Sequence, residues 1–315
     1  MISPVLFLVF NRPETTRKVF AAIRAARPPK LYVAADGPRP AKSGELERCS
    51  EVRRIATSVD WPCEVKTLFR ESNLGCKMGV SGGISWFFEQ EPQGIVLEDD
   101  VLPMPSFFDY CDDLLTRYRD DERVTMISGC NLVADRLRVD ESYFFARSCH
   151  IWGWASWRRA WRYYDVRMPA WPAWRDGGGL TALADGNPLF EFYWRHKFNS
   201  CYSGRGENTW DYQWTFACWL AGGLSAISAV NQVHNLGFGN DATHTTKGTP
   251  EYVIACPAQP LGLPLIHPNA VVRQPTADAL VDSRIYGINA VDFVRRGIRL
   301  AHRAFDPRRL MPRRG

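Results

Sequence analysis

The stretch Gln93-Gly94-Ile95-Val96-Leu97-Glu98-Asp99-Asp100 decides the fold that we predict for this chain. Its centre, Ile95 to Leu97, is an apolar run of the kind found in strands that are buried on both faces. Three acids follow this run directly. Ligands of open α/β sheets bind at the carboxyl ends of such strands, so we expect the acids to mark a site.

Three adjacent carboxylates repel one another unless a cation joins them, and an all-oxygen site suits Mg²⁺ or Mn²⁺. Surface runs of acids are common, so the triplet alone leaves a metal site and a solvated acidic turn as alternatives. Carboxylates also favour helix N-termini. However, Pro103 and Pro105 delay the next helix to about Ser106, where Ser106 and Asp109 form a predicted capping box. The acids are therefore expected on a loop.

Strands and helices alternate over the first 130 or so residues, which predicts a mostly parallel, doubly wound sheet. The predicted strands cover 5–10, 31–35, 63–69, 95–97 and 124–128, and the predicted helices cover 13–27, 44–58, 77–91 and 106–118. No GxGxxG follows the first strand, and the sequence contains no GxxxxGK[ST]. A conventional dinucleotide site or P-loop is therefore not expected.

Composition predicts a globular protein with a substantial core, since 45% of the 315 residues are hydrophobic. The apolar run from Pro4 to Phe10 is too short to span a bilayer and lacks the features of a signal peptide, so a cytoplasmic location is expected. Nine cysteines without CxxC pairs indicate reduced thiols. The formal charge of +5 is modest, and nucleic acid is not an expected partner.

The C-terminal part combines prolines with arginines. Prolines recur from Pro250 to Pro275, which predicts an irregular, wrapping segment. A basic amphipathic helix is predicted from about Ala290 to Phe305. Such a helix can lie on anionic lipid at the inner face of a membrane, or it can pack its apolar side onto the body of the protein.

Ten of the twelve tryptophans lie between Trp152 and Trp219. Aromatic side chains at this density form either a platform for sugar rings or a core, and Trp154, Trp210 and Trp214 are our candidates for acceptor binding. Asp211 stands among Trp210, Tyr212 and Trp214. If these groups desolvate it, its pKa rises, as the pKa of a general base must. An isolated structural aspartate is the alternative.

Three motifs together resemble one family. They are Ser72-Asn73-Leu74-Gly75-Cys76-Lys77 before a helix, the strand from Gly94 to Val101 with its acids, and Pro105-Ser106-Phe107-Phe108-Asp109-Tyr110. Over residues 4–131 they resemble the nucleotide-sugar half of N-acetylglucosaminyltransferase I and related bacterial nucleotide-diphospho-sugar transferases with the GT-A fold. The acceptor half departs from the eukaryotic enzyme almost completely, so the resemblance implies no particular acceptor.

The resemblance implies a role for each matching position. Contacts with the nucleotide-sugar would come from Asn11 and Arg12 in the turn after the first strand, and from Asp36, which ends the second strand and would read the uracil. Further contacts would come from Asn73 and Lys77 of the 72–77 motif, and from Glu98 and Asp99, the first two acids of the triplet. Asp100 would bind Mn²⁺ or Mg²⁺. His244, in the glycine-rich segment from Gly237 to Thr245, would bind the metal or the diphosphate, although a lone loop histidine is usually neither.

The family's catalytic base lies in a Trp-Asp-Asp-Trp setting, which residues 210–214 match in part, so Asp211 is the predicted base and Asp241 the next candidate. We therefore expect a GT-A type α/β fold. Residues 1–131 would form the nucleotide-sugar half, 132–247 the acceptor and catalytic half of the same domain, and 248–315 a C-terminal wrapping segment with a basic helix. The expected activity is inverting, metal-dependent transfer from a UDP-sugar to a glycan or glycolipid hydroxyl, with N-acetylglucosamine one candidate sugar. The alternatives are a sugar nucleotidyltransferase and a non-catalytic glycan-binding protein.

Overall fold

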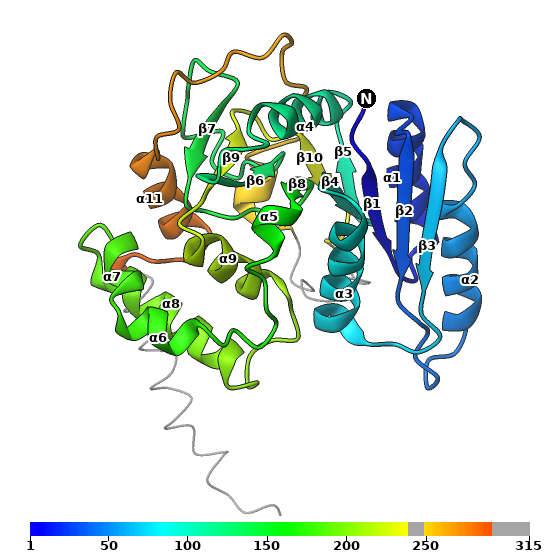
Figure 1. The fold of residues 1–315 in the computed structure, drawn as a ribbon, viewed down its shortest axis with the longest axis horizontal. Helices are drawn as coiled ribbons and strands as arrows, with labels where there is room; N and C mark the ends of the chain where they lie inside the picture. The colour runs from blue at the N-terminus through cyan, green and yellow to red at the C-terminus, as the bar shows by residue number, and fades with distance from the viewer. Residues whose placement is uncertain (239–248, 292–315) are drawn as a thin grey trace, which may run out of the picture.

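The fold is known from a computed structural model, which describes residues 1–238 and 249–291. An eight-stranded sheet with the order β3-β2-β1-β4-β8-β6-β9-β7 forms its centre (Figure 1). The strands are β1 (Val5–Val9), β2 (Lys30–Ala35), β3 (Glu64–Phe69), β4 (Gln93–Glu98), β6 (Val124–Ser128), β7 (Tyr143–Ala146), β8 (Trp154–Trp157) and β9 (Leu224–Ser228). A separate two-stranded sheet pairs β5 (Val101–Pro103) with β10 (Val233–Asn235).

Most strands of the large sheet run in one direction. β1, β2, β3 and β4 are parallel neighbours, and β6 is parallel to β9, whereas β8 is antiparallel to both β4 and β6, and β7 is antiparallel to β9. Because β4 and β6 both oppose β8, they point the same way. The prediction of an α/β fold with a mostly parallel sheet is therefore confirmed, and its assignment to the GT-A type stays a prediction.

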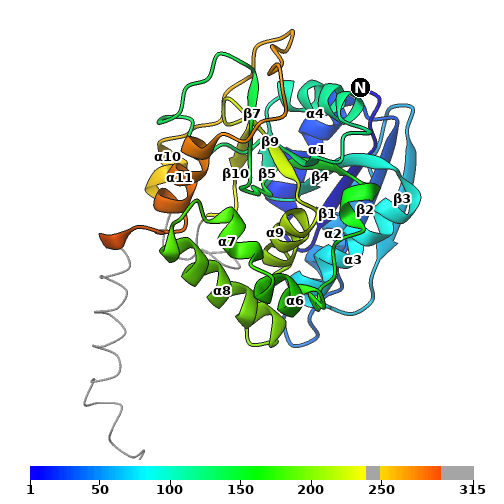
Figure 2. The ribbon, with the colours of Figure 1, turned by 60° about the vertical axis from the view of Figure 1, so that its left-hand side comes forward.

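Helices cover both faces of this sheet (Figures 1 and 2). Val5 and Phe7 of β1 pack in one apolar cluster with α1, α2 and α4, and the alternate residues Leu6 and Leu8 pack in a second cluster with α3, α8 and α9. The helices are α1 (Pro13–Ala26), α2 (Glu45–Ala56), α3 (Gly75–Gln90), α4 (Ser106–Arg117), α5 (Arg158–Trp161), α6 (Trp171–Asp176), α7 (Gly179–Leu183), α8 (Pro188–Tyr202), α9 (Asp211–Leu220), α10 (Glu251–Ile254) and α11 (Pro275–Arg284).

The predicted strands and helices of the first 130 residues all exist, with ends that differ by a few residues. Two details were wrong. The sequence pattern did not predict β5, which follows the acid triplet and pairs with the distant β10. The capping box is absent, because the Ser106 hydroxyl donates to Gln232 Oε1 (2.9 Å) and accepts from the Leu261 amide (2.9 Å). The Ser106 hydroxyl therefore bonds to residues that are distant in sequence and does not cap the first turn of α4.

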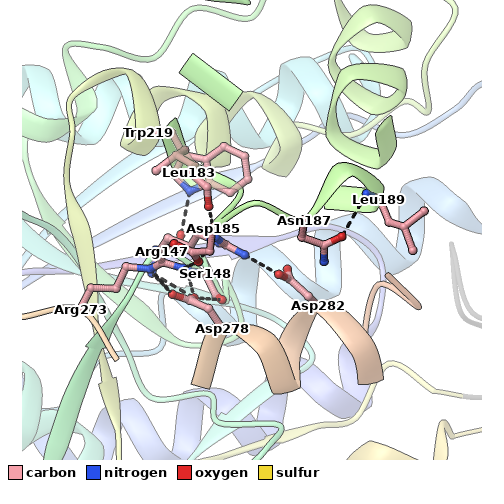
Figure 3. A network of polar contacts seen from close by, with 10 residues as sticks. All are labelled: Arg147, Ser148, Leu183, Asp185, Asn187, Leu189, Trp219, Arg273, Asp278 and Asp282. Atoms are coloured by element: carbon pink, nitrogen blue, oxygen red, sulfur yellow. Dashed lines mark hydrogen bonds and ion pairs between the residues drawn. The ribbon is translucent and has the colours of Figure 1, made fainter. Parts of the chain in front are cut away.

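A buried ionic network attaches α11, in the predicted wrapping segment, to the end of β7 (Figure 3). Asp278 accepts from the amides of Arg147 (3.1 Å) and Ser148 (3.2 Å) and from the Ser148 hydroxyl (2.7 Å). The Arg147 guanidinium contacts Asp282 and, at 3.1 Å, Asp185. The helix α11 begins where the segment predicted to be irregular, Pro250 to Pro275, ends, and within that segment only the four residues of α10 are helical.

Within the two described ranges, no helix is long and apolar enough to cross a membrane. Beyond residue 291, the predicted basic helix lies outside the described residues. The proposed division of the chain at residues 131 and 247 stays a prediction, although β8 and β9, from the second part, complete the same sheet as β1 to β4.

Candidate active site

The acid triplet lies where β4 ends, beside the end of β1. The Asp99 carboxylate is buried and accepts a hydrogen bond from the Phe10 amide at 3.0 Å. Asp100 Oδ2 accepts from Arg12 Nη1 at 2.6 Å, and Arg12 Nε lies 3.9 Å from Asp99 Oδ1. The turn between β1 and α1 thus supplies one cation to three neighbouring acids.

Negative charge exceeds positive charge at this strand end. Burial raises the pKa of Glu98, and the charges of Asp100 and Asp99 raise it further, whereas Arg12 lowers it. Burial also raises the pKa of Asp99, against the effect of Arg12. The pKa of Arg12 itself is raised, because the charges of Asp99 and Asp100 outweigh the lowering by burial. A further cation would relieve this repulsion.

Asp211, the predicted base, is the first residue of α9. Its charge raises the pKa of Glu98 and of Cys76, so it lies within electrostatic reach of the triplet. Burial raises the pKa of Asp211, as the sequence predicted, while the Thr209 hydroxyl and the backbone amides at the start of α9 act against this rise. The Thr209 hydroxyl donates to Asp211 Oδ1. The other carboxylate oxygen of Asp211, Oδ2, makes no hydrogen bond to the described side chains.

Three of the predicted nucleotide contacts use their polar atoms to fix loops. Asn11 Nδ2 donates to Glu45 Oε1 at 2.8 Å, and Asn73 Nδ2 donates to the Gly37 carbonyl at 2.9 Å. The Asp36 carboxylate accepts from the Leu74 and Gly75 amides at 3.0 Å each, and so holds the start of α3. Their contacts with a nucleotide stay predictions. Lys77, half-buried on the first turn of α3, makes no ion pair with any described residue.

The predicted acceptor contacts of Trp154, Trp210 and Trp214 are wrong in the structure. These side chains are 0%, 1% and 0% exposed. Trp154 stacks on Trp210, with ring centroids 5.8 Å apart, and packs against Trp214 at 5.5 Å. Rings that are covered by other rings cannot offer a face to a sugar, so these three tryptophans form the core beneath α9.

Trp152 is the aromatic residue near the acids that sequence reasoning missed. Gly153 has a φ of +64°, and Trp152, unlike Trp154, packs with the cluster around α1 and α4. Its half-buried ring meets the half-buried ring of Phe238 edge-on, with centroids 5.6 Å apart. No feature of the sequence distinguishes Trp152 from its buried neighbours except the glycine that follows it.

Gly237, next to Phe238, brings the end of β10 against the triplet. A Cβ atom at this position would lie 2.3 Å from Asp100 Oδ2, and the Leu236 amide donates to the Asp100 carbonyl at 2.7 Å. The glycine therefore permits the close approach of the chain to the carboxylate. His244 and Asp241 lie outside the described residues.

The donor atoms at the triplet suit a hard divalent cation, because they are carboxylate oxygens. Among residues 1–238 and 249–291, no group of three or more His, Cys, Asp or Glu side chains is arranged to hold a metal ion. Mg²⁺ and similar ions commonly take one or two protein carboxylates and complete their shell with substrate phosphates and water. Asp100, with Glu98 beside it, fits such a shared site.

Comparisons with known proteins give no family assignment. No family model matches the sequence, and no curated protein matches it. Among solved structures, the apo form of a UDP-glucose pyrophosphorylase has a TM-score of 0.38 at 9% identity, covering 81% of this chain and 97% of that one. Mouse xyloside xylosyltransferase 1 has a TM-score of 0.33 at 13% identity, covering 69% and 81%. Likenesses this weak carry no argument about function.

Proposed function

We propose that the protein is an inverting, metal-dependent glycosyltransferase that uses a UDP-sugar. The observation that carries the proposal is that the charge of Asp211, at the start of α9, acts on Glu98 of the Glu98-Asp99-Asp100 turn at the end of β4. One group of acids could hold a cation and a diphosphate, while a separate carboxylate of raised pKa lies within electrostatic reach of it. An inverting displacement at an anomeric carbon by a hydroxyl can use both elements.

In the proposed reaction, Asp100 and Glu98 would hold a Mn²⁺ or Mg²⁺ ion at the donor site. The ion, when bound, supplies Lewis-acid neutralisation of the charge that develops on the leaving group. Arg12, already paired with Asp100 at 2.6 Å, is placed to share that charge. Asp99, which is buried, orients Arg12 and the end of β1.

Asp211 is the proposed general base. It accepts the proton of an acceptor hydroxyl while that oxygen forms a bond to the anomeric carbon from the face opposite the diphosphate, whose bond breaks. A single displacement of this kind inverts the stereocentre. The raised pKa of Asp211 improves it as a proton acceptor. Trp152 and Phe238 replace the buried tryptophans as the aromatic surface on which we place the acceptor.

Of the alternatives, a glycan-binding protein was favoured by the tryptophans, and most of these are now accounted for by the core. A sugar nucleotidyltransferase would share the sheet and the cation, but it would release pyrophosphate from a nucleoside triphosphate. Incubation with UTP and a sugar phosphate, compared with incubation with UDP-sugars, separates the two enzymes by their products.

The direct test of the donor site is calorimetric titration of UDP with and without Mn²⁺. We expect Asp100→Asn to lower the Mn²⁺-dependent affinity ~10-fold or more, because it removes one charged partner of the ion. Asp109→Asn is the matched control, since Asp109 is an exposed acid on α4 and the substitution changes the charge equally. If the two variants bind UDP alike, the assignment of Asp100 is wrong.

A further inference from the structure

A cavity of about 720 Å³ opens at the amino ends of β1 and β4, at the edge of the sheet opposite the acid triplet. Its wall combines residues 2–4, 91–93 and 157–159 with Arg119 and Arg162. The chain begins here beside α4 (Figure 1), and the Ser3 amide donates to Asp112 of α4 at 2.9 Å. The six residues of β4 separate the cavity from the candidate active site by about 20 Å. It is therefore a separate site.

Four arginines line this cavity: Arg119, Arg158, Arg159 and Arg162. The Arg158 guanidinium donates to the last carbonyls of α3, and the Arg159 guanidinium donates to the Tyr118 (2.7 Å) and Arg119 (2.8 Å) carbonyls after α4. Basic side chains often cap helix C-termini in this way. These contacts also hold the two guanidinium groups in place, while Nη1 of each makes no hydrogen bond within the described part of the chain.

The positive charge of the cavity is not matched by acids in its wall. Glu91, the acid that lines it, already accepts from Lys30 Nζ at 2.8 Å and from the Tyr32 hydroxyl at 2.6 Å. Arg162 reaches Glu122 at 3.3 Å, on the exposed surface. The Arg119 guanidinium has neither a hydrogen bond nor an ion pair to any residue that the structure describes.

Ser3 provides a second, independent sign of a ligand. Ser3 lines the cavity and is 2% exposed, and its buried hydroxyl has no hydrogen-bond partner among the described residues. A buried hydroxyl without a partner is destabilising and rare in native proteins. A ligand oxygen would satisfy it. Beside it, Trp157 lies under the Arg159 guanidinium, 4.3 Å from ring centroid to Cζ, and adds apolar surface.

We propose that this arginine cavity binds a small phosphate ester, with the phosphate among the guanidinium groups and Ser3 and the organic part against the apolar wall. Guanidinium groups present parallel N–H donors that match phosphate oxygens. The volume is in the range of small-molecule sites. Burial lowers the pKa of Arg159 despite the opposing charges of nearby acids. A bound anionic ligand would raise this pKa again. The proposal is independent of the proposed transferase activity.

The test is calorimetric titration of the full chain with phenyl phosphate in EDTA, because binding of a phosphate at the acid triplet is expected to need a divalent cation. We expect saturable binding with one site, which weakens as NaCl is added. Benzyl alcohol, which keeps the ring and lacks the charge, should not bind. Benzoate tests phosphate against carboxylate, and an affinity equal to that of phenyl phosphate would overturn the choice of phosphate.

Arg119→Ala and Arg162→Ala should each weaken phenyl phosphate binding about tenfold, since each removes a charged donor that the core does not need. Arg167→Ala is the matched control, because Arg167 is exposed, lies close in sequence and does not line the cavity. Ser3→Ala should weaken binding without lowering the melting temperature. The absence of binding, or unchanged affinity in all three cavity variants, would overturn the proposal.

Discussion

Gly237→Ala offers a sharp perturbation of the proposed donor site without a change of charge. The added Cβ would lie 2.3 Å from Asp100 Oδ2 and 3.0 Å from Asn235 Oδ1. Ordinary contacts begin near 3.4 Å, so the Asp100 carboxylate must move by about 1 Å. A shift of this size takes Asp100 out of the position in which it meets Arg12 at 2.6 Å.

The fold should tolerate this substitution. The backbone at Gly237 does not require a positive φ, and the atoms in the way belong to the ends of side chains. Loss of one charge-assisted hydrogen bond corresponds to roughly 1.5–3 kcal/mol, so we expect the Mn²⁺-dependent affinity for UDP to fall ~10-fold to ~100-fold. The melting temperature should stay within a few degrees of the parent.

The assay is calorimetric titration of UDP in the presence of Mn²⁺, with differential scanning calorimetry as the stability measurement. Gly262→Ala is the matched control, because a Cβ there meets no atom within 4 Å and no positive φ is needed. Parent-like UDP affinity in Gly237→Ala would refute the steric reasoning if Asp100→Asn still weakens binding. If neither variant weakens it, the site itself is misplaced.

Three further predictions follow from the site and the core. Asp211→Asn should lower kcat ~10²–10⁴-fold and leave UDP-sugar binding nearly unchanged in calorimetry, because a general base acts in the transition state; near-normal turnover would move the base elsewhere. Trp214→Ala should lower the free energy of unfolding by about 3–5 kcal/mol in urea titrations, since it empties a fully buried site; a loss below 1 kcal/mol would contradict its place in the core. Burial raises the pKa of Asp282 to about 6, above its value in the unfolded chain. The contribution of Asp282 to stability is therefore present at low pH and is lost as pH rises from about 4 to about 7. Asp282→Asn should reduce this dependence of the unfolding free energy on pH in chemical denaturation, and an unchanged pH dependence would contradict the assignment.

Local patterns predicted the nucleotide-sugar half well because its elements are regular. In parallel strands buried on both faces, apolar runs such as Val5–Val9 have few alternative conformations, and prolines and glycines mark their ends. The same logic placed the acids at a strand end. It could not predict β5 or the contact between Gly237 and Asp100, since both depend on a chain segment more than 130 residues away.

The tryptophans show why the acceptor side was harder to predict. A tryptophan in a core and a tryptophan in a sugar site have the same sequence signature, and burial is decided by which elements pack together. Trp154 is covered because α9 lies on it, whereas Trp152, two residues earlier, is turned to the opposite cluster at Gly153. The arginine cavity is likewise assembled from distant segments, and its arginines are unremarkable in the sequence.

The central claim is tested most directly by proton NMR of the protein incubated with Mn²⁺ and a panel of α-linked UDP-sugars, with water and simple sugars as acceptors. We predict Mn²⁺-dependent release of UDP from at least one donor, with the β anomer as the first product before mutarotation. Initial formation of the α anomer would contradict the inverting mechanism. Failure to turn over any UDP-sugar, together with release of pyrophosphate from UTP and a sugar phosphate, would contradict the assignment as a glycosyltransferase.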